Sequence, residues 1–72
     1  MYLVMELQKN KDGHVANIVT EHETLALAES KYHMVLSAAA VSGIPVHSAI
    51  ILSDEGFPME HRRWKHEQDN AV

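Results

Sequence analysis

The chain has 72 residues, a formal net charge of −4 at pH 7 and no cysteine. A chain this short has room for one hydrophobic core and buries only about 60% of its unfolded surface, so oligomerisation is expected to supply the missing burial. The acidic balance argues against general nucleic-acid binding, and the missing cysteines exclude a disulfide framework and a cysteine-based zinc site.

The first expected element is a strand at residues 2–8, with the sequence YLVMELQ. Both of its alternating faces are largely apolar, which predicts a place in the middle of a sheet. This start does not have the pattern of a signal peptide, and no segment reaches the roughly 20 apolar residues of a membrane span. We therefore expect a soluble, cytoplasmic protein that does not enter a membrane.

A second strand is expected at residues 14–20, after the polar segment 9–13. That segment ends in Asp-Gly, which favours a tight hairpin turn. The two strands are therefore expected to pair antiparallel.

The longest periodic run, at residues 24–42, predicts the one helix of the chain. Thr24 has a hydroxyl that can cap the first turn. Gly43, through a left-handed conformation, and the following Pro45 are expected to stop the helix. Thr20 begins a capping-box pattern and is a competing start.

Two apolar stripes run along this predicted helix. The stripe expected to face the core consists of Leu25, Ala28, Tyr32, Val35, Leu36 and Ala39. The opposite stripe consists of Leu27, Met34, Ala38 and Val41. A helix lying on one sheet requires a single apolar stripe, so the second predicts an oligomer interface. The alternative is simple exposure, which single apolar residues tolerate.

The remaining elements are two strands at residues 45–53 and 59–66, joined by a turn at 54–58. The first is rich in β-branched residues, and the second alternates charges that suit the edge of a sheet. The last residues, 67–72, are expected to form a flexible tail.

The expected fold is therefore α+β, with the order ββαββ: a single, mostly antiparallel four-stranded sheet with one helix packed on one face. Residues 1–66 form the expected domain. One helix covers one face of such a sheet, and the other face carries apolar residues in either strand register. This face must be exposed or paired with another subunit.

Three stretches carry a resemblance to known proteins: YLVMELQ at 2–8, AESKYHMVLSAAAVSGIPVHSAIIL at 28–52 and KHE at 65–67. Together they resemble a group of small uncharacterised proteins encoded in phages and prophages of Gram-positive gut bacteria. The similar stretches contain no functional motif. The resemblance implies a viral origin, a small accessory role and a location in the host cytoplasm, and it supplies no catalytic residues.

The strongest local charge feature is the basic-aromatic segment HRRWKH at residues 61–66. Arg62, Arg63 and Lys65, placed around Trp64, could bind a phosphate or stack on a base. The favoured alternative is an edge strand whose charges are solvated and whose Trp covers the core, because acidic residues flank the cluster. In an oligomer, several copies of the arginines could converge on a small anionic, nucleotide-like ligand.

The chain has six histidines, a high proportion. His33 and His47 are the candidates for a shared site, because only a short loop separates their elements. Glu29 and His33 have helical i, i+4 spacing, but a surface side-chain pair is the more common explanation. Neither the metal-binding HExxH pattern, a G-x-S-x-G nucleophile elbow nor a phosphate-binding glycine loop is present. The sequence therefore predicts no enzyme, metal or cofactor.

Two functions remain after these exclusions. The first is a non-enzymatic, homo-oligomeric binding protein that inhibits a host protein or sequesters a small anionic ligand, a form of counter-defence. The second is a structural or assembly accessory of the virion. A shared cleft lined by the arginines, His33 and His47 would favour the first, and their separation would favour the second.

Overall fold

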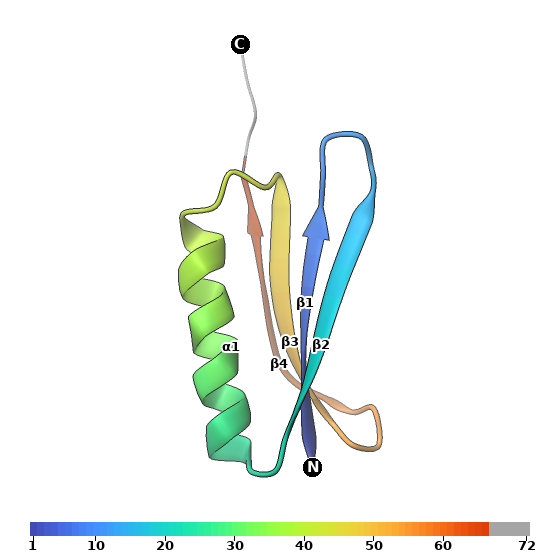
Figure 1. Cartoon of the computed structure of the whole chain (residues 1–72), viewed down its shortest axis with the longest axis vertical. Helices are drawn as coiled ribbons and strands as arrows, with labels where there is room; N and C mark the ends of the chain where they lie inside the picture. The colour runs from blue at the N-terminus through green and yellow to red at the C-terminus, as the bar shows by residue number, and fades with distance from the viewer. Residues whose placement is uncertain (67–72) are drawn as a thin grey trace.

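The computed structural model describes residues 1–66, and the predicted tail lies outside them. The elements are β1 (Tyr2–Lys9), β2 (Val15–His22), α1 (Leu25–Ala40), β3 (Val46–Ser53) and β4 (Pro58–Lys65). All neighbouring strands pair antiparallel in the order β2-β1-β3-β4. The helix lies against one face of this sheet (Figure 1), which confirms the predicted ββαββ fold.

The β1–β2 hairpin confirms the predicted Asp-Gly turn. Gly13 has a φ angle of 88°, a left-handed conformation that glycine adopts without steric cost. The backbone N–H of Asn10 donates to the His14 carbonyl at 2.9 Å, and the Asp12 side chain accepts from the His14 N–H at 2.9 Å. These bonds close the loop between two strands of eight residues each.

Thr24 caps α1 as predicted, because its side-chain oxygen accepts from the Leu27 N–H at 3.2 Å. The competing start is wrong, since Thr20 lies within β2. The predicted stop is also wrong in its details. The helix ends at Ala40, where the N–H groups of Val41 and Ser42 bond back to carbonyls of the last turn, and Gly43 does not have a positive φ angle.

The core lies between α1 and the two central strands. It consists of Val4, Ala28, Tyr32, Val35, Ala49 and Ile51, with Leu25 and Leu36 packed against its margin. Three buried alanines, Ala28, Ala39 and Ala49, have no measurable exposure. Their small side chains allow the helix backbone to approach the sheet closely. The predicted core stripe of the helix is therefore confirmed.

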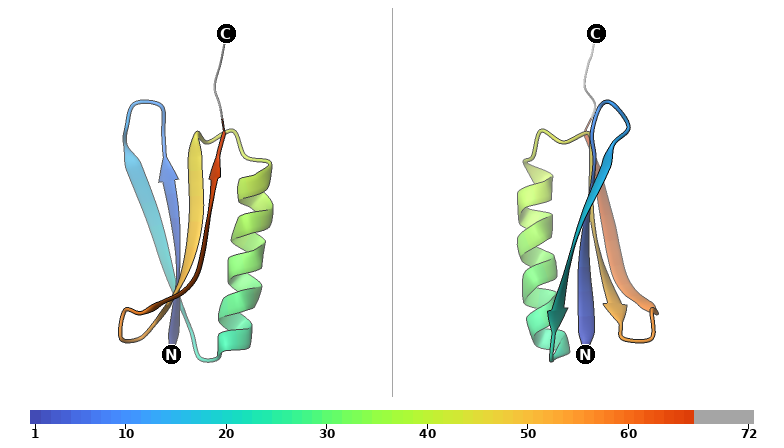
Figure 2. Two further views of the ribbon diagram at one scale, coloured as in Figure 1. Left: turned by 180° about the vertical axis from the view of Figure 1, so that it is seen from behind. Right: turned by 45° about the vertical axis from the view of Figure 1, so that its right-hand side comes forward.

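The opposite side of the sheet carries no covering element among the described residues, as the right-hand view of Figure 2 shows. We call this side the open face. By the strand register its residues are Leu3, Met5, Leu7, Lys9, Val15, Asn17, Val19, Glu21, Val46, Ser48, Ile50, Leu52, His61, Arg63 and Lys65. Most are apolar, so a large hydrophobic surface faces outward in a single copy.

Candidate functional site

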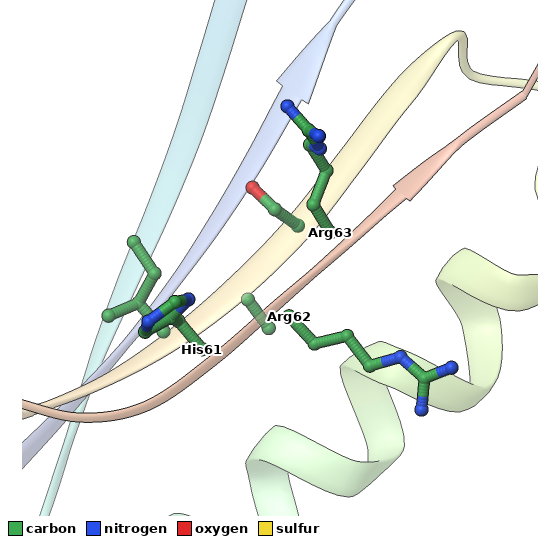
Figure 3. Close-up of a pocket in the computed structure, with 6 residues that line it drawn as sticks. His61, Arg62 and Arg63 are labelled. Atoms are coloured by element: carbon green, nitrogen blue, oxygen red, sulfur yellow. The ribbon is translucent and has the colours of Figure 1, made fainter.

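The basic-aromatic segment of β4 is divided between the two sides of the sheet. In the β3–β4 register, Arg62 and Trp64 lie opposite Ala49 and His47, which face the helix. Arg63 belongs to the open face. Figure 3 shows Arg62 extending toward α1, whereas His61 and Arg63 extend away from it. Strand alternation therefore prevents these side chains from forming one site.

On the helix side, three side chains of the C-terminal segment form a stacked row. The Arg62 guanidinium carbon lies 4.4 Å from the Trp64 ring centroid, and the His66 ring is nearly parallel to the indole at 6.5 Å. His66 Nε2 donates to the Ala39 carbonyl at 2.7 Å, so this ring ties the end of β4 to the end of α1. Within residues 1–66, the Trp64 indole nitrogen is the buried side-chain polar atom without a hydrogen-bond partner.

On the open face, a shallow hollow of about 560 Å³ lies between β3 and β4. Its volume is in the range of small-molecule sites. The residues that line it are Ser48, Ala49, Ile50, His61, Arg62 and Arg63. A hydroxyl, an imidazole and a guanidinium beside an apolar surface are chemically suited to an anion. The sequence did not single out Ser48 or His61, because the register decides which side chains join Arg63.

His47 is buried, with 3% of its surface exposed, beneath the end of the helix. Its Nε2 lies 2.6 Å from a carboxylate oxygen of Glu6, and its Nδ1 lies 3.0 Å from the Ser42 hydroxyl. The carboxylate can only accept, so Nε2 donates to it. In the neutral ring, Nδ1 then accepts from the Ser42 hydroxyl. Gln8 donates a further hydrogen bond to Glu6 at 3.0 Å.

The environment of Glu6 combines opposing effects on its pKa. Burial alone would raise the pKa of this carboxyl, but the hydrogen bonds from His47 and Gln8 and the positive charges of His47 and Lys31 outweigh it. The pKa of Glu6 is therefore lowered from its ordinary value of 4.5. The carboxylate remains charged at neutral pH and holds the imidazole in one orientation.

The Ser42–His47–Glu6 chain has the connectivity of a hydrolase triad, with the two ring nitrogens exchanged. Ser42 Oγ also accepts from the Ile44 N–H at 3.4 Å, which directs the hydroxyl into its own loop. The hollow described above opens on the other side of the sheet. We therefore interpret the three residues as a buried network that joins the helix end to the sheet.

Sequence reasoning missed Glu6 and Ser42 as partners of His47. One signal was present: a single carboxylate in the middle of a largely apolar strand requires a hydrogen-bonding partner if it is buried. The identity of that partner was not readable, because Glu6 and His47 are 41 positions apart.

His33 does not join His47, contrary to the expected shared site. It is exposed on α1, and its ring contacts the Tyr32 ring edge-on with centroids 5.5 Å apart. Tyr32 is buried against the sheet. Burial and the nearby Glu60 carboxylate raise its pKa above the ordinary 10.0, although the positive charge of Arg62 partly opposes this effect.

The second apolar stripe of the helix faces away from the sheet. The exposed fractions are 54% for Leu27, 63% for Met34 and 87% for Val41, and Ala38 is also exposed. Together with the open face, this stripe leaves apolar surface on both sides of the molecule.

Among residues 1–66, no group of three or more His, Cys, Asp or Glu is arranged to hold a metal ion. The helix of this region is too short to cross a bilayer.

Comparison with protein families, curated proteins and solved structures finds no match to this chain.

Proposed function

We propose that this chain is a small, non-enzymatic binding protein of phage type that acts as a homo-oligomer and inhibits a host protein. In this proposal, one apolar surface binds a second copy and the other binds the partner protein. The resemblance of residues 2–8, 28–52 and 65–67 to phage and prophage proteins supports the viral setting.

The observation that carries this proposal is the presence of apolar surfaces on opposite sides of one thin molecule. The open face lies on one side, and the stripe of Leu27, Met34 and Val41 lies on the other. Monomeric proteins rarely expose contiguous apolar patches of more than a few hundred Å². Two such surfaces allow self-association and partner binding at the same time.

A small anionic ligand is the other molecule that such a binding protein could sequester. The hollow at Ser48, His61 and Arg63 supports it, since these side chains offer hydrogen bonds and positive charge to a phosphate-like group. Trp64 and His47 do not line that hollow, and Arg62, although it lines part of it, extends its side chain toward the helix. A protein partner therefore has the stronger support.

The test is purification of the tagged chain from bacterial cells at moderate salt, followed by native mass spectrometry. We expect a multiple of the 8.1 kDa chain mass, with a host protein bound substoichiometrically. Met34→Asp, which places a carboxylate on the helix stripe, should reduce either the oligomer mass or the capture of the host protein. A monomeric chain that retains neither protein nor nucleotide would contradict the proposal.

Virion assembly is the second candidate, and one observation favours it. Arg62, Arg63, His33 and His47 do not line a common cleft, as a ligand-binding site built from them would require. Sedimentation velocity over a concentration series distinguishes the two functions. An assembly accessory should grow into large species, whereas a host-directed binder should stop at a small closed oligomer.

A further inference from the structure

We infer that the open face binds the open face of a second copy, about a two-fold axis that places Glu21 of each copy against Lys65 of the other. This inference rests on the proposed function, because it identifies which of the two apolar surfaces forms the homo-oligomer. It leaves the outer stripe of the helix for the partner protein.

The dimensions of the open face favour a second copy as its occupant. Each strand has eight residues. At about 3.3 Å per residue and 4.8 Å between strands, the face measures about 26 Å by 19 Å, or roughly 500 Å² in projection. A stable interface buries about 800 Å² of accessible surface on each partner, so corrugated side chains approach this size only if most of the face is covered. A second copy presents a face of the same length and width.

The charges on the open face favour the same occupant. Glu21 is its one acidic residue, and it lies at one corner, in register with Leu3 and Leu52. Lys65 lies at the diagonally opposite corner, in register with Val46 and Lys9. Lys9 and Arg63, the other two basic residues of the face apart from His61, lie toward the same end as Lys65. A single copy therefore has an acidic corner and a basic end, with a mainly apolar surface between them.

A two-fold axis in the plane of the interface can exchange these corners. If the axis is perpendicular to the diagonal that joins Glu21 to Lys65 and passes through its midpoint, each Glu21 meets a Lys65 of the other copy. The centres of the two faces then also meet. The strands of the two copies then cross steeply, as in orthogonal sheet packing. The central contacts are apolar, and Ile50 lies among them. In this arrangement the apolar centres are buried against each other, and each Glu21 carboxylate lies against the basic end of the other copy.

The first test compares matched aspartate substitutions on the two apolar surfaces. Ile50→Asp on the open face should raise the dimer dissociation constant by at least about 100-fold, since it buries an unpaired carboxylate. Val19→Asp, at a position already 46% exposed, is a second variant with a smaller risk of unfolding. Met34→Asp on the helix stripe is the matched control and should leave the dimer intact. Light scattering after size exclusion measures the mass, and circular dichroism verifies the fold.

The second test concerns the axis. Glu21→Lys and Lys65→Glu should each weaken the dimer by about an order of magnitude at low salt, because each creates two symmetry-related repulsive pairs. The double variant restores the attraction and should regain the wild-type dissociation constant. High salt should reduce the differences among all four proteins.

The outcomes separate this inference from the proposed function. If Met34→Asp dissociates the oligomer and folded Ile50→Asp and Val19→Asp do not, the helix stripe is the interface and the inference is overturned, while an oligomeric binder remains. If the wild-type chain is a monomer at micromolar concentration, both the open-face dimer and the proposed homo-oligomeric function are contradicted. An unchanged affinity in the two charge variants would overturn the two-fold arrangement.

Discussion

At the scale of single residues, the pair of Glu6 and His47 is a source of pH-dependent stability. The pKa of Glu6 is lower in the folded protein than its ordinary value of 4.5. Its charged form therefore contributes stability that is present above this value and is lost as the pH falls through the lower folded pKa. Folding of the chain should weaken in acid for this reason.

Replacing Glu6 by Gln tests this linkage. We expect the variant to lose about 1–3 kcal/mol of unfolding free energy at pH 7, because a charged acceptor of the buried His47 is removed. The loss should shrink as the pH falls below the ordinary pKa of a glutamate. Urea denaturation at fixed protein concentration, over a pH series from neutral to acid, measures it. Glu23→Gln, at an exposed position, is the control, and an E6Q deficit that is independent of pH would contradict the prediction.

Tyr32 should show the opposite pH dependence. Its pKa is raised in the folded state by burial and by Glu60, so its contribution to stability is present below the ordinary value of 10.0 and is lost as the pH rises through the raised one. The alkaline absorbance titration of the wild type, minus that of Tyr32→Phe, isolates this phenol. We expect a midpoint above 10.0. A midpoint at or below that value would show that Tyr32 is accessible to water.

At the scale of elements, the start of α1 depends on one hydroxyl. Thr24 accepts from the Leu27 N–H, and removing a cap of this kind costs about 1 kcal/mol. Thr24→Ala should therefore destabilise the chain by this amount, whereas Thr24→Ser should retain most of the stability. Chemical denaturation of both variants measures the difference. Equal stability of the two variants would indicate that packing, and not the cap, determines where the helix begins.

Local sequence patterns did not predict how α1 ends or on which side of the sheet each side chain of β4 lies. A glycine followed by a proline predicted a left-handed stop, but the helix ends before Gly43, where Ser42 binds His47. For the cluster HRRWKH the pattern favoured an edge strand with solvated charges over one cationic site, and β4 does lie at the edge of the sheet. Strand alternation sends Arg62 and Arg63 to opposite sides of the sheet. The local sequence therefore predicts that a helix ends here and that a charged strand follows. The tertiary contacts determine which partner or which side of the sheet each side chain faces.

At the scale of the whole molecule, stability should depend on protein concentration. A single copy leaves the open face and the helix stripe in water, and binding of a second copy to the native state adds stability by mass action. We expect the Tm of the wild type to rise over a 100-fold increase in concentration. The Tm of Ile50→Asp should be lower and independent of concentration. A wild-type Tm that does not change would contradict the oligomer.

The sequence alone determined the elements, their order, the fold class and the core stripe of α1, because alternation and helical periodicity are properties of neighbouring residues. It also indicated that one sheet face would lack a cover. Only the tertiary structure decided that Glu6, Ser42 and His47 meet, that His33 stays apart, and that His61 and Ser48 flank Arg63. The Glu6–His47 pair joins strands that are 41 positions apart. The β3–β4 register places Ser48 beside Arg63, and the position of the helix on the sheet keeps His33 away from His47.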